Sequence, residues 1–149
     1  MLPDSIALEV VTPERRVVRA VATEVQVPAL DGFLGILPGH APLLSELGEG
    51  ELSYRAEGQT YYAAVFGGYV EVLAGRVILL AEVSERAEEI DSARAAKAKA
   101  AAEKILSTPG TPDEAAAAAR RALARADLRL KVAAHATTGA SARELAHSA

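Results

Sequence analysis

The sequence predicts two regions of different fold class: an N-terminal all-β antiparallel sandwich followed by a C-terminal two-helix antiparallel hairpin. Short apolar runs separated by glycine turns fill the first region, residues 1–86. Every Tyr and Phe lies at or before Tyr69, whereas alanine and charged residues dominate from Ala87 onward. Alanine and long charged residues are good helix formers. We therefore expect a β-sandwich at 1–86, a helical hairpin at 87–134 and a flexible tail at 135–149.

Length and composition exclude several classes of protein. Half of the 149 residues are hydrophobic, which is enough for a folded core. The absence of cysteine excludes disulfides, thiolate metal sites and cysteine nucleophiles. The net charge of −4 argues against nucleic acid as the main ligand. No stretch resembles a signal peptide or is long enough to span a bilayer, so we expect a soluble protein that reaches a membrane only through partners.

Period-two alternation and short apolar runs define the predicted strands. The expected strands are Ile6–Val10, Val17–Val21, Thr23–Val27, Phe33–Leu37, a strand starting near Pro42, Glu51–Arg55, Tyr61–Phe66, Tyr69–Leu73 and Arg76–Leu80. Glycine and proline mark the expected turns and breaks, at Pro38-Gly39, Gly48–Gly50, Glu57–Gln59, Gly67-Gly68 and Ala74-Gly75. Many short strands with glycine turns and no intervening helix indicate an antiparallel sandwich or barrel.

The second region reads as two helices joined by a short break. Neither Gly nor Pro occurs from Ala87 to Leu106, and Ser107–Pro112 interrupts the pattern. Thr111 is the expected N-cap of the second helix, with Glu114 completing a capping box. One stripe of this helix is apolar, at Ala119, Leu123, Ala126 and Leu130. Alanine buries little area, so we expect a weakly held, movable hairpin.

The residues offer no catalytic constellation. A hydrolytic site needs a nucleophile, a base and an orienting group, and no serine stands in a Gly-x-Ser-x-Gly context. His40 is expected to be a turn histidine bonded to nearby backbone. The three histidines, His40, His135 and His147, are too scattered to predict a metal site. An enzyme is therefore the least favoured class.

Two motifs resemble one known family. The segment Gly32-Phe-Leu-Gly-Ile-Leu-Pro-Gly-His-Ala-Pro-Leu-Leu44 closely resembles the signature segment of the epsilon subunit of F-type ATP synthases. The segment Ile90-Asp-Ser-Ala-Arg-Ala95 resembles the family's Ile/Leu-Asp-x-x-Arg-Ala motif. A sandwich followed by a helical hairpin is also the family's architecture, so the resemblance covers residues 1 to about 134.

The resemblance implies a regulatory ATP site on the hairpin, while no cofactor is required. Its residues would be Glu85, Ile90, Asp91, Arg94, Ala95, Arg125 and Arg129. Arginine supplies planar donors for phosphate oxygens. Ala101 departs from the pattern, because ATP-binding relatives carry a further arginine there. A purely structural interpretation stays open, in which Asp91 caps a helix and the arginines form a solvated face.

The resemblance further implies a non-catalytic rotor subunit on the cytoplasmic face of the bacterial inner membrane. Its expected partners are the gamma subunit, the ring of c subunits and the alpha/beta head. Stalk and ring contact would involve Gly32, Phe33, Leu34, Pro38 and His40, and contact with acidic loops of beta would involve Arg120, Arg121, Arg125 and Arg129. The extended hairpin would inhibit ATP hydrolysis. The competing hypothesis is a free-standing interaction module of another complex.

Overall fold

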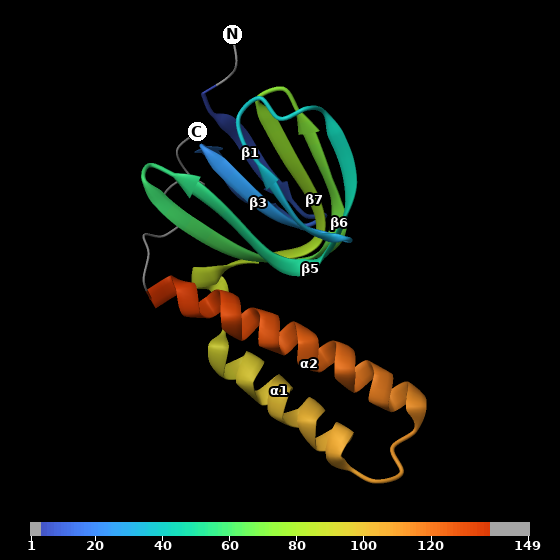
Figure 1. The fold of residues 1–149 in the computed structure, drawn as a ribbon. Coiled ribbons are helices and arrows are strands. Elements are labelled where there is room, and N and C mark those ends of the chain that lie inside the picture. The colour runs from blue at the N-terminus through green and yellow to red at the C-terminus, as the bar shows by residue number, and fades with distance from the viewer. Residues whose placement is uncertain (1–3, 138–149) are drawn as a thin grey trace.

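A computed structural model describes residues 4–137 of the chain and confirms the predicted fold class (Figure 1). The strands are β1 (Ile6–Val11), β2 (Arg16–Ala22), β3 (Glu24–Ala29), β4 (Gly32–Ile36), β5 (Leu43–Ala56), β6 (Gln59–Leu73) and β7 (Arg76–Arg86). They are followed by the 3-10 turn η1 (Ala87–Glu89), helix α1 (Ser92–Ser107), helix α2 (Asp113–Ala133) and the 3-10 turn η2 (Ala134–Thr137).

The strands form one hydrogen-bonded sheet that curls into two layers (Figure 1). Its order is β2-β1-β7-β6-β5-β3-β4. The β5–β6 and β6–β7 hairpins form as predicted, and Tyr54 pairs with Tyr61 across the first of them, with ring centroids 5.4 Å apart. One pair, β1 with β7, runs parallel rather than antiparallel. No hairpin turn joins these two strands, so chain connectivity does not impose an antiparallel direction.

Strands β5 and β6 run through glycines that were predicted to end them. A Cβ at Gly50 would stand 2.5 Å from the Cβ of Pro28 on β3, and a Cβ at Gly68 would stand 2.0 Å from the carbonyl oxygen of Leu80 on β7. These glycines therefore permit close approach of neighbouring strands instead of making turns. The predicted breaks at Gly48–Gly50 and Gly67-Gly68 are wrong for this reason, and four expected strands merge into two.

Strand β2 carries a second difference from the predicted pattern. The register with β1 shifts between Val10 and Val11, so one extra residue of β2 enters the ladder. Val17 and Val18 are consequently both buried, while Val21 is 66% exposed. A bulge reverses which residues face the core beyond it, so alternation counted from Val17 gives the wrong face.

Helix α1 begins at Ser92, five residues later than predicted. Asp91 is its N-cap, and the Asp91 carboxylate accepts a hydrogen bond from the backbone N–H of Arg94 at 3.0 Å. Ile90 is extended and separates the helix from η1. The interpretation of Asp91 as a capping residue is confirmed.

The predicted capping box at Thr111 does not form. The Thr111 hydroxyl instead donates to the carbonyl oxygens of Ile105 and Thr108, at 3.0 and 2.8 Å. Pro112 takes the N-cap position without a side-chain hydrogen bond. The Thr111 hydroxyl therefore caps the C-terminal end of α1 and does not cap the N-terminus of α2.

The two helices run antiparallel along one side of the sandwich, with α2 against the strands and α1 against α2 (Figure 1). The buried residues between the helices are alanines, as predicted: Ala95, Ala102, Ala119 and Ala126. A small apolar cluster joins the hairpin to the strands, through Ala64, Phe66, Ala87 and Val132. Neither helix in the described range is long and apolar enough to cross a membrane.

The predicted tail at 135–149 overlaps η2 at its start, and positions 138–149 lie outside the described residues. Contacts with the sandwich hold His135 in place. Its ring stacks on Tyr62, and its Nε2 lies 3.2 Å from Oε2 of Glu51. Side-chain packing therefore extends the ordered chain past the end of α2.

Candidate functional site

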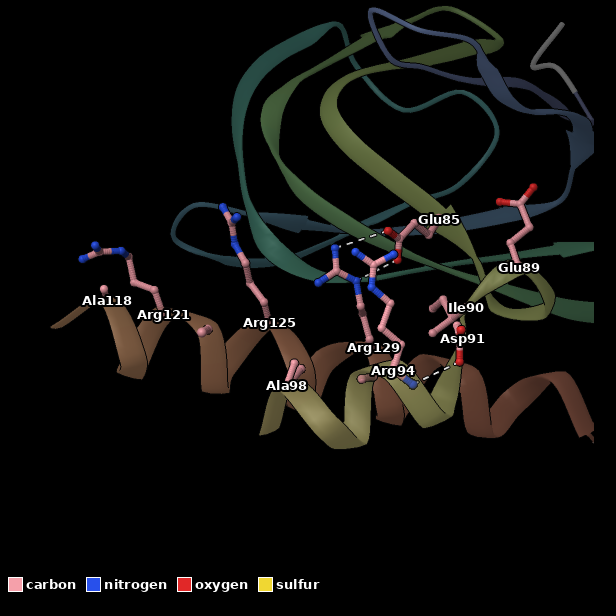
Figure 2. Close-up of a pocket in the computed structure, with 13 residues that line it drawn as sticks. Glu85, Glu89, Ile90, Asp91, Arg94, Ala98, Ala118, Arg121, Arg125 and Arg129 are labelled. Atoms are coloured by element: carbon pink, nitrogen blue, oxygen red, sulfur yellow. Dashed lines mark hydrogen bonds and ion pairs between the residues drawn. The ribbon is translucent and has the colours of Figure 1, made fainter. Parts of the chain in front are cut away.

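A pocket of about 610 Å³ opens between α1, α2 and the end of β7 (Figure 2). Its lining consists of Glu85, Glu89, Ile90, Asp91, Arg94, Ala95, Ala98, Ala118, Arg121, Ala122, Arg125, Ala126 and Arg129. This volume falls within the range of small-molecule sites, about 300–1,000 Å³. The many alanines leave the space open, because short side chains on both helices do not fill it.

The structure brings together all seven residues predicted for a nucleotide site. Glu85 lies near the end of β7, and Ile90 and Asp91 lie in the linker after η1. The other members lie on the helices, with Arg94 and Ala95 in the first turn of α1 and Arg125 and Arg129 on α2.

Arg129 connects α2 to β7. Its Nε and Nη2 donate to the two carboxylate oxygens of Glu85, at 2.8 and 3.2 Å. The guanidinium also lies 4.6 Å from the centroid of the Phe66 ring. Both partners are part-buried, so this bidentate pair is stronger than a fully exposed one.

Arg125, one turn earlier on α2, is bound to β5. Its Nε and Nη2 both donate to Oε1 of Glu49, at 2.9 and 2.8 Å, and hydrogen bonding to Glu49 raises the pKa of Arg125. The side chain also contacts Phe66, at 5.5 Å from the ring centroid. Two arginines of the pocket therefore have their charges matched by acids of the sandwich.

Glu89 joins the pocket to the hinge between sandwich and hairpin. Arg15, in the β1–β2 connection, donates to both Glu89 oxygens at 2.8 and 2.6 Å, and Arg86 contacts Glu89 through its backbone N–H and its guanidinium. Arg86 also donates to the carbonyl oxygen of Val17 at 3.0 Å. Burial favours a higher pKa for Glu89, but the hydrogen bonds and charges of Arg15 and Arg86 outweigh it and lower the pKa.

Two guanidinium groups in the pocket have no matching acid. In the part of the chain that the structure describes, the side chains of Arg94 and Arg121 form no ion pair or hydrogen bond. Unpaired guanidiniums in a pocket of this size suit phosphate or carboxylate groups. Among residues 4–137, no cluster of His, Asp and Glu is arranged to hold a metal ion.

Two charged residues of the lining, Glu89 and Arg121, and four alanines lie outside the predicted site. The family resemblance instead places Arg121 in contact with acidic loops of the beta subunit. The spacing of Arg121, Arg125 and Arg129 by four residues indicates one helix face and was the available signal for Arg121. No sequence pattern predicts that Glu89 pairs with Arg15, which lies 74 residues earlier in the chain.

The residues predicted for stalk and ring contact lie around the β3–β4 turn and the turn before β5. Gly32 is exposed, Phe33 is 59% exposed, and Leu34 and Pro38 are half-buried. The Nδ1 of His40 lies 2.7 Å from the carbonyl oxygen of Ala41, which confirms the expected turn histidine. The exposed apolar side chains near these turns are those of Leu30, Phe33, Leu37 and Leu44.

Family models match nearly the whole described chain. The model for the ATP synthase delta/epsilon chain beta-sandwich domain matches residues 5–87, and that for the long alpha-helix domain matches residues 88–134. The chain belongs to the ATP synthase delta/epsilon chain family. It is an epsilon subunit of F-type ATP synthase, a non-catalytic member of that complex.

Curated relatives agree with this assignment, and a solved structure shares the fold. The ATP synthase epsilon chain of Solibacter usitatus is 51% identical over 127 residues, covering 83% of this chain and 95% of the relative. That of Koribacter versatilis is 51% identical over 109 residues, covering 73% and 77%. A chain in the Euglena gracilis mitochondrial ATP synthase structure of OSCP, F1 and c-ring has the same fold, with a TM-score of 0.76 at 23% identity, covering 91% of this chain and 84% of that one.

Proposed function

We propose that the pocket is a regulatory ATP site and that ATP holds the hairpin against the sandwich. The observation that supports this most strongly is that all seven residues of the predicted site line one pocket at the hairpin–sandwich boundary. A ligand bound there contacts β7, the linker and both helices at once. Binding to the compact arrangement alone stabilises it by an amount that grows with ligand concentration.

The docked hairpin is held by contacts that permit release. Its apolar contact with the strands is small, and the ion pairs of Arg125 and Arg129 with the sandwich are partly exposed. Partly exposed pairs contribute about 1 kcal/mol or less each. We infer that the docked and released arrangements of the hairpin have similar free energies without ATP. ATP binding then stabilises the docked arrangement.

We propose that the released hairpin inhibits ATP hydrolysis by reaching the alpha/beta head. In the compact arrangement the sandwich neutralises Arg125 and Arg129, while Arg120 and Arg121 are exposed. Release frees Arg125 and Arg129, so that all four positive charges are then available to acidic loops of the beta subunit. Arg125 and Arg129 therefore bind either the sandwich or the beta subunit, but not both.

For the sandwich we propose contact with the gamma subunit and the ring of c subunits, on the cytoplasmic face of the bacterial inner membrane. The exposed side chains of Leu30, Phe33, Leu37 and Leu44 give the turns around β4 an apolar surface. Such surfaces are typical of protein contacts. In this position the subunit couples proton translocation to ATP synthesis at catalytic sites in other subunits.

Calorimetric titration of the purified chain with ATP, with and without magnesium, tests the regulatory site. We expect saturable binding that the Arg94→Ala variant loses, because Arg94 offers an unpaired guanidinium to the pocket. The control variant Lys97→Ala removes a charge one turn along α1, outside the pocket lining. Absence of binding at millimolar ATP contradicts the regulatory site and leaves the subunit's place in the complex unaffected.

A further inference from the structure

Arg120 and Arg121 are adjacent arginines on α2 that differ in what they face. Both side chains are exposed, and neither forms an ion pair within the described residues. Only Arg121 lines the pocket. The two positions are therefore not equivalent, although sequence alone groups them as one basic surface.

Arg121 extends a row of arginines along one face of α2. It precedes Arg125 by four residues and Arg129 by eight, so the row is about 12 Å long at a rise of 1.5 Å per residue. Figure 2 shows Arg121 at the opposite end of this row from Asp91. The pocket is consequently elongated, and Arg121 marks its far end.

The charges are unevenly distributed along this length. The pocket's three carboxylates, those of Glu85, Glu89 and Asp91, all lie at the linker end. The far end holds Arg121 and the short side chains of Ala118 and Ala122. At the linker end, arginines pair with Glu85 and Glu89, and Arg94 lies close to Asp91 (Figure 2), so the charges there largely balance. At the far end no carboxylate lines the pocket, and an anionic group is attracted to Arg121.

The two neighbouring arginines on α2 cannot replace Arg121 without losing other bonds, and the unpaired Arg94 lies on α1 at the linker end (Figure 2). Arg125 is bound to Glu49 and Arg129 to Glu85, so a phosphate that binds either one competes with a carboxylate of the sandwich. Arg121 has no such partner in the described part of the chain and binds an anion without breaking an existing ion pair. An unpaired guanidinium therefore contributes its full charge to the ligand.

We infer that Arg121 is a further binding residue of the pocket and contacts the terminal phosphate of a nucleoside triphosphate. The nucleoside then lies toward Ile90 and Asp91, where an apolar side chain and a carboxylate suit a base and hydroxyl groups. This inference rests on the proposed ATP site. It adds a consequence of its own: Arg121 makes the pocket distinguish a triphosphate from a diphosphate and a monophosphate.

The test is equilibrium binding of ATP, ADP and AMP to the full chain and to Arg121→Gln. We expect ATP affinity to fall about tenfold in the variant, as for loss of one charge-assisted hydrogen bond. ADP and AMP lack the third phosphate, so their affinities stay at the wild-type values and the ratio of ATP to ADP affinity decreases. The matched control is Arg120→Gln, which removes the same charge from the adjacent position and leaves all three affinities unchanged in the isolated chain. Arg121→Lys keeps the charge and recovers part of the loss.

The outcomes separate this inference from the proposed function. Saturable ATP binding that is equal in wild type and Arg121→Gln overturns the role of Arg121 and leaves the ATP site intact. Equal losses for ATP, ADP and AMP also overturn the assignment to the terminal phosphate. A wild-type chain that binds no ATP overturns both. Because Arg121 is exposed, its substitution does not disturb a core, and circular dichroism of each variant verifies the fold.

Discussion

The imidazole of His135 lies flat on the ring of Tyr62, with the ring centroids 3.5 Å apart and an interplanar angle of 6°. His135 belongs to η2 and Tyr62 to β6, so the stack fastens the end of the hairpin to the sandwich. Its Nε2 also lies 3.2 Å from Oε2 of Glu51 on β5. The arginine pairs hold the C-terminal half of α2, and this contact holds the 3-10 turn that follows it.

The stack predicts a local effect of His135→Ala. Aromatic pairs contribute about 0.5–1.5 kcal/mol beyond their buried area, so we expect amide exchange at Val132 and Ala133 to accelerate by a factor of about ten. Exchange in the sheet stays unchanged. His40→Ala is the matched control, since His40 contacts only its own turn in the described structure. Equal protection of α2 in His135→Ala and the wild type contradicts the fastening role.

Glu89 predicts a pH dependence of stability. The pKa of this carboxyl is lowered in the folded chain from its ordinary value of 4.5. A lowered folded-state pKa contributes stability that is fully present above the ordinary value and is lost as the pH falls through the folded pKa. Urea unfolding below pH 4.5 should therefore show a shallower loss of stability for Glu89→Gln than for the wild type.

The control for this pH dependence is a carboxylate outside the Arg15–Glu89–Arg86 contacts. Glu103→Gln removes an exposed carboxyl from α1 without touching Arg15 or Arg86. It should keep the steeper wild-type loss of stability below pH 4.5. Parallel pH profiles for Glu89→Gln and the wild type would show that the Arg15–Glu89–Arg86 contacts do not stabilise the folded chain.

Sequence was sufficient where a local pattern decides the structure. The Glu57-Gly58 and Ala74-Gly75 turns and the alanine interface of the hairpin each follow from a few adjacent residues. Glycine was misread where its neighbour lies elsewhere in the chain. Gly50 and Gly68 look like turn residues until Pro28 and Leu80 are placed beside them.

The candidate site shows the same limit. Family resemblance predicted Arg94, Arg125 and Arg129, because those residues stand at the family's positions along two helices. Their acid partners, Glu49 and Glu85, belong to strands β5 and β7, and only the docked arrangement reveals which arginine each carboxylate binds. Sequence could not indicate that Arg125 is paired while Arg121 is not.

The close approach of β6 to β7 at Gly68 predicts that adding a side chain there lowers the free energy of unfolding. The φ of Gly68 is +117°, and an added Cβ would meet the Leu80 carbonyl oxygen at 2.0 Å. Gly68→Ala must therefore shift β6 away from β7, with a loss of unfolding free energy on the order of 3 kcal/mol. Urea denaturation measures it. Gly35→Ala is the control, because a Cβ there meets nothing within 4 Å, and its change should stay within about 0.5 kcal/mol.

Substitutions at Asp91 can separate its role in helix capping from its role in ligand binding. One carboxylate oxygen, Oδ1, accepts the backbone N–H of Arg94, and the residue also lines the pocket. Asparagine is as good an N-cap as aspartate, whereas alanine costs about 1 kcal/mol. In Asp91→Asn the oxygen caps the helix, so the amide NH₂ replaces an acceptor in the pocket with a donor.

We therefore expect Asp91→Asn to retain wild-type stability in urea unfolding and to bind ATP several-fold more weakly, measured by calorimetry. Asp91→Ala should lose both stability and affinity. If Asp91→Asn binds ATP with wild-type affinity, the second carboxylate oxygen of Asp91 does not contact the ligand. Asp91 then acts only as a capping residue. The asparagine variant thus decides between the two interpretations that the sequence leaves open, since it changes the pocket without changing the start of α1.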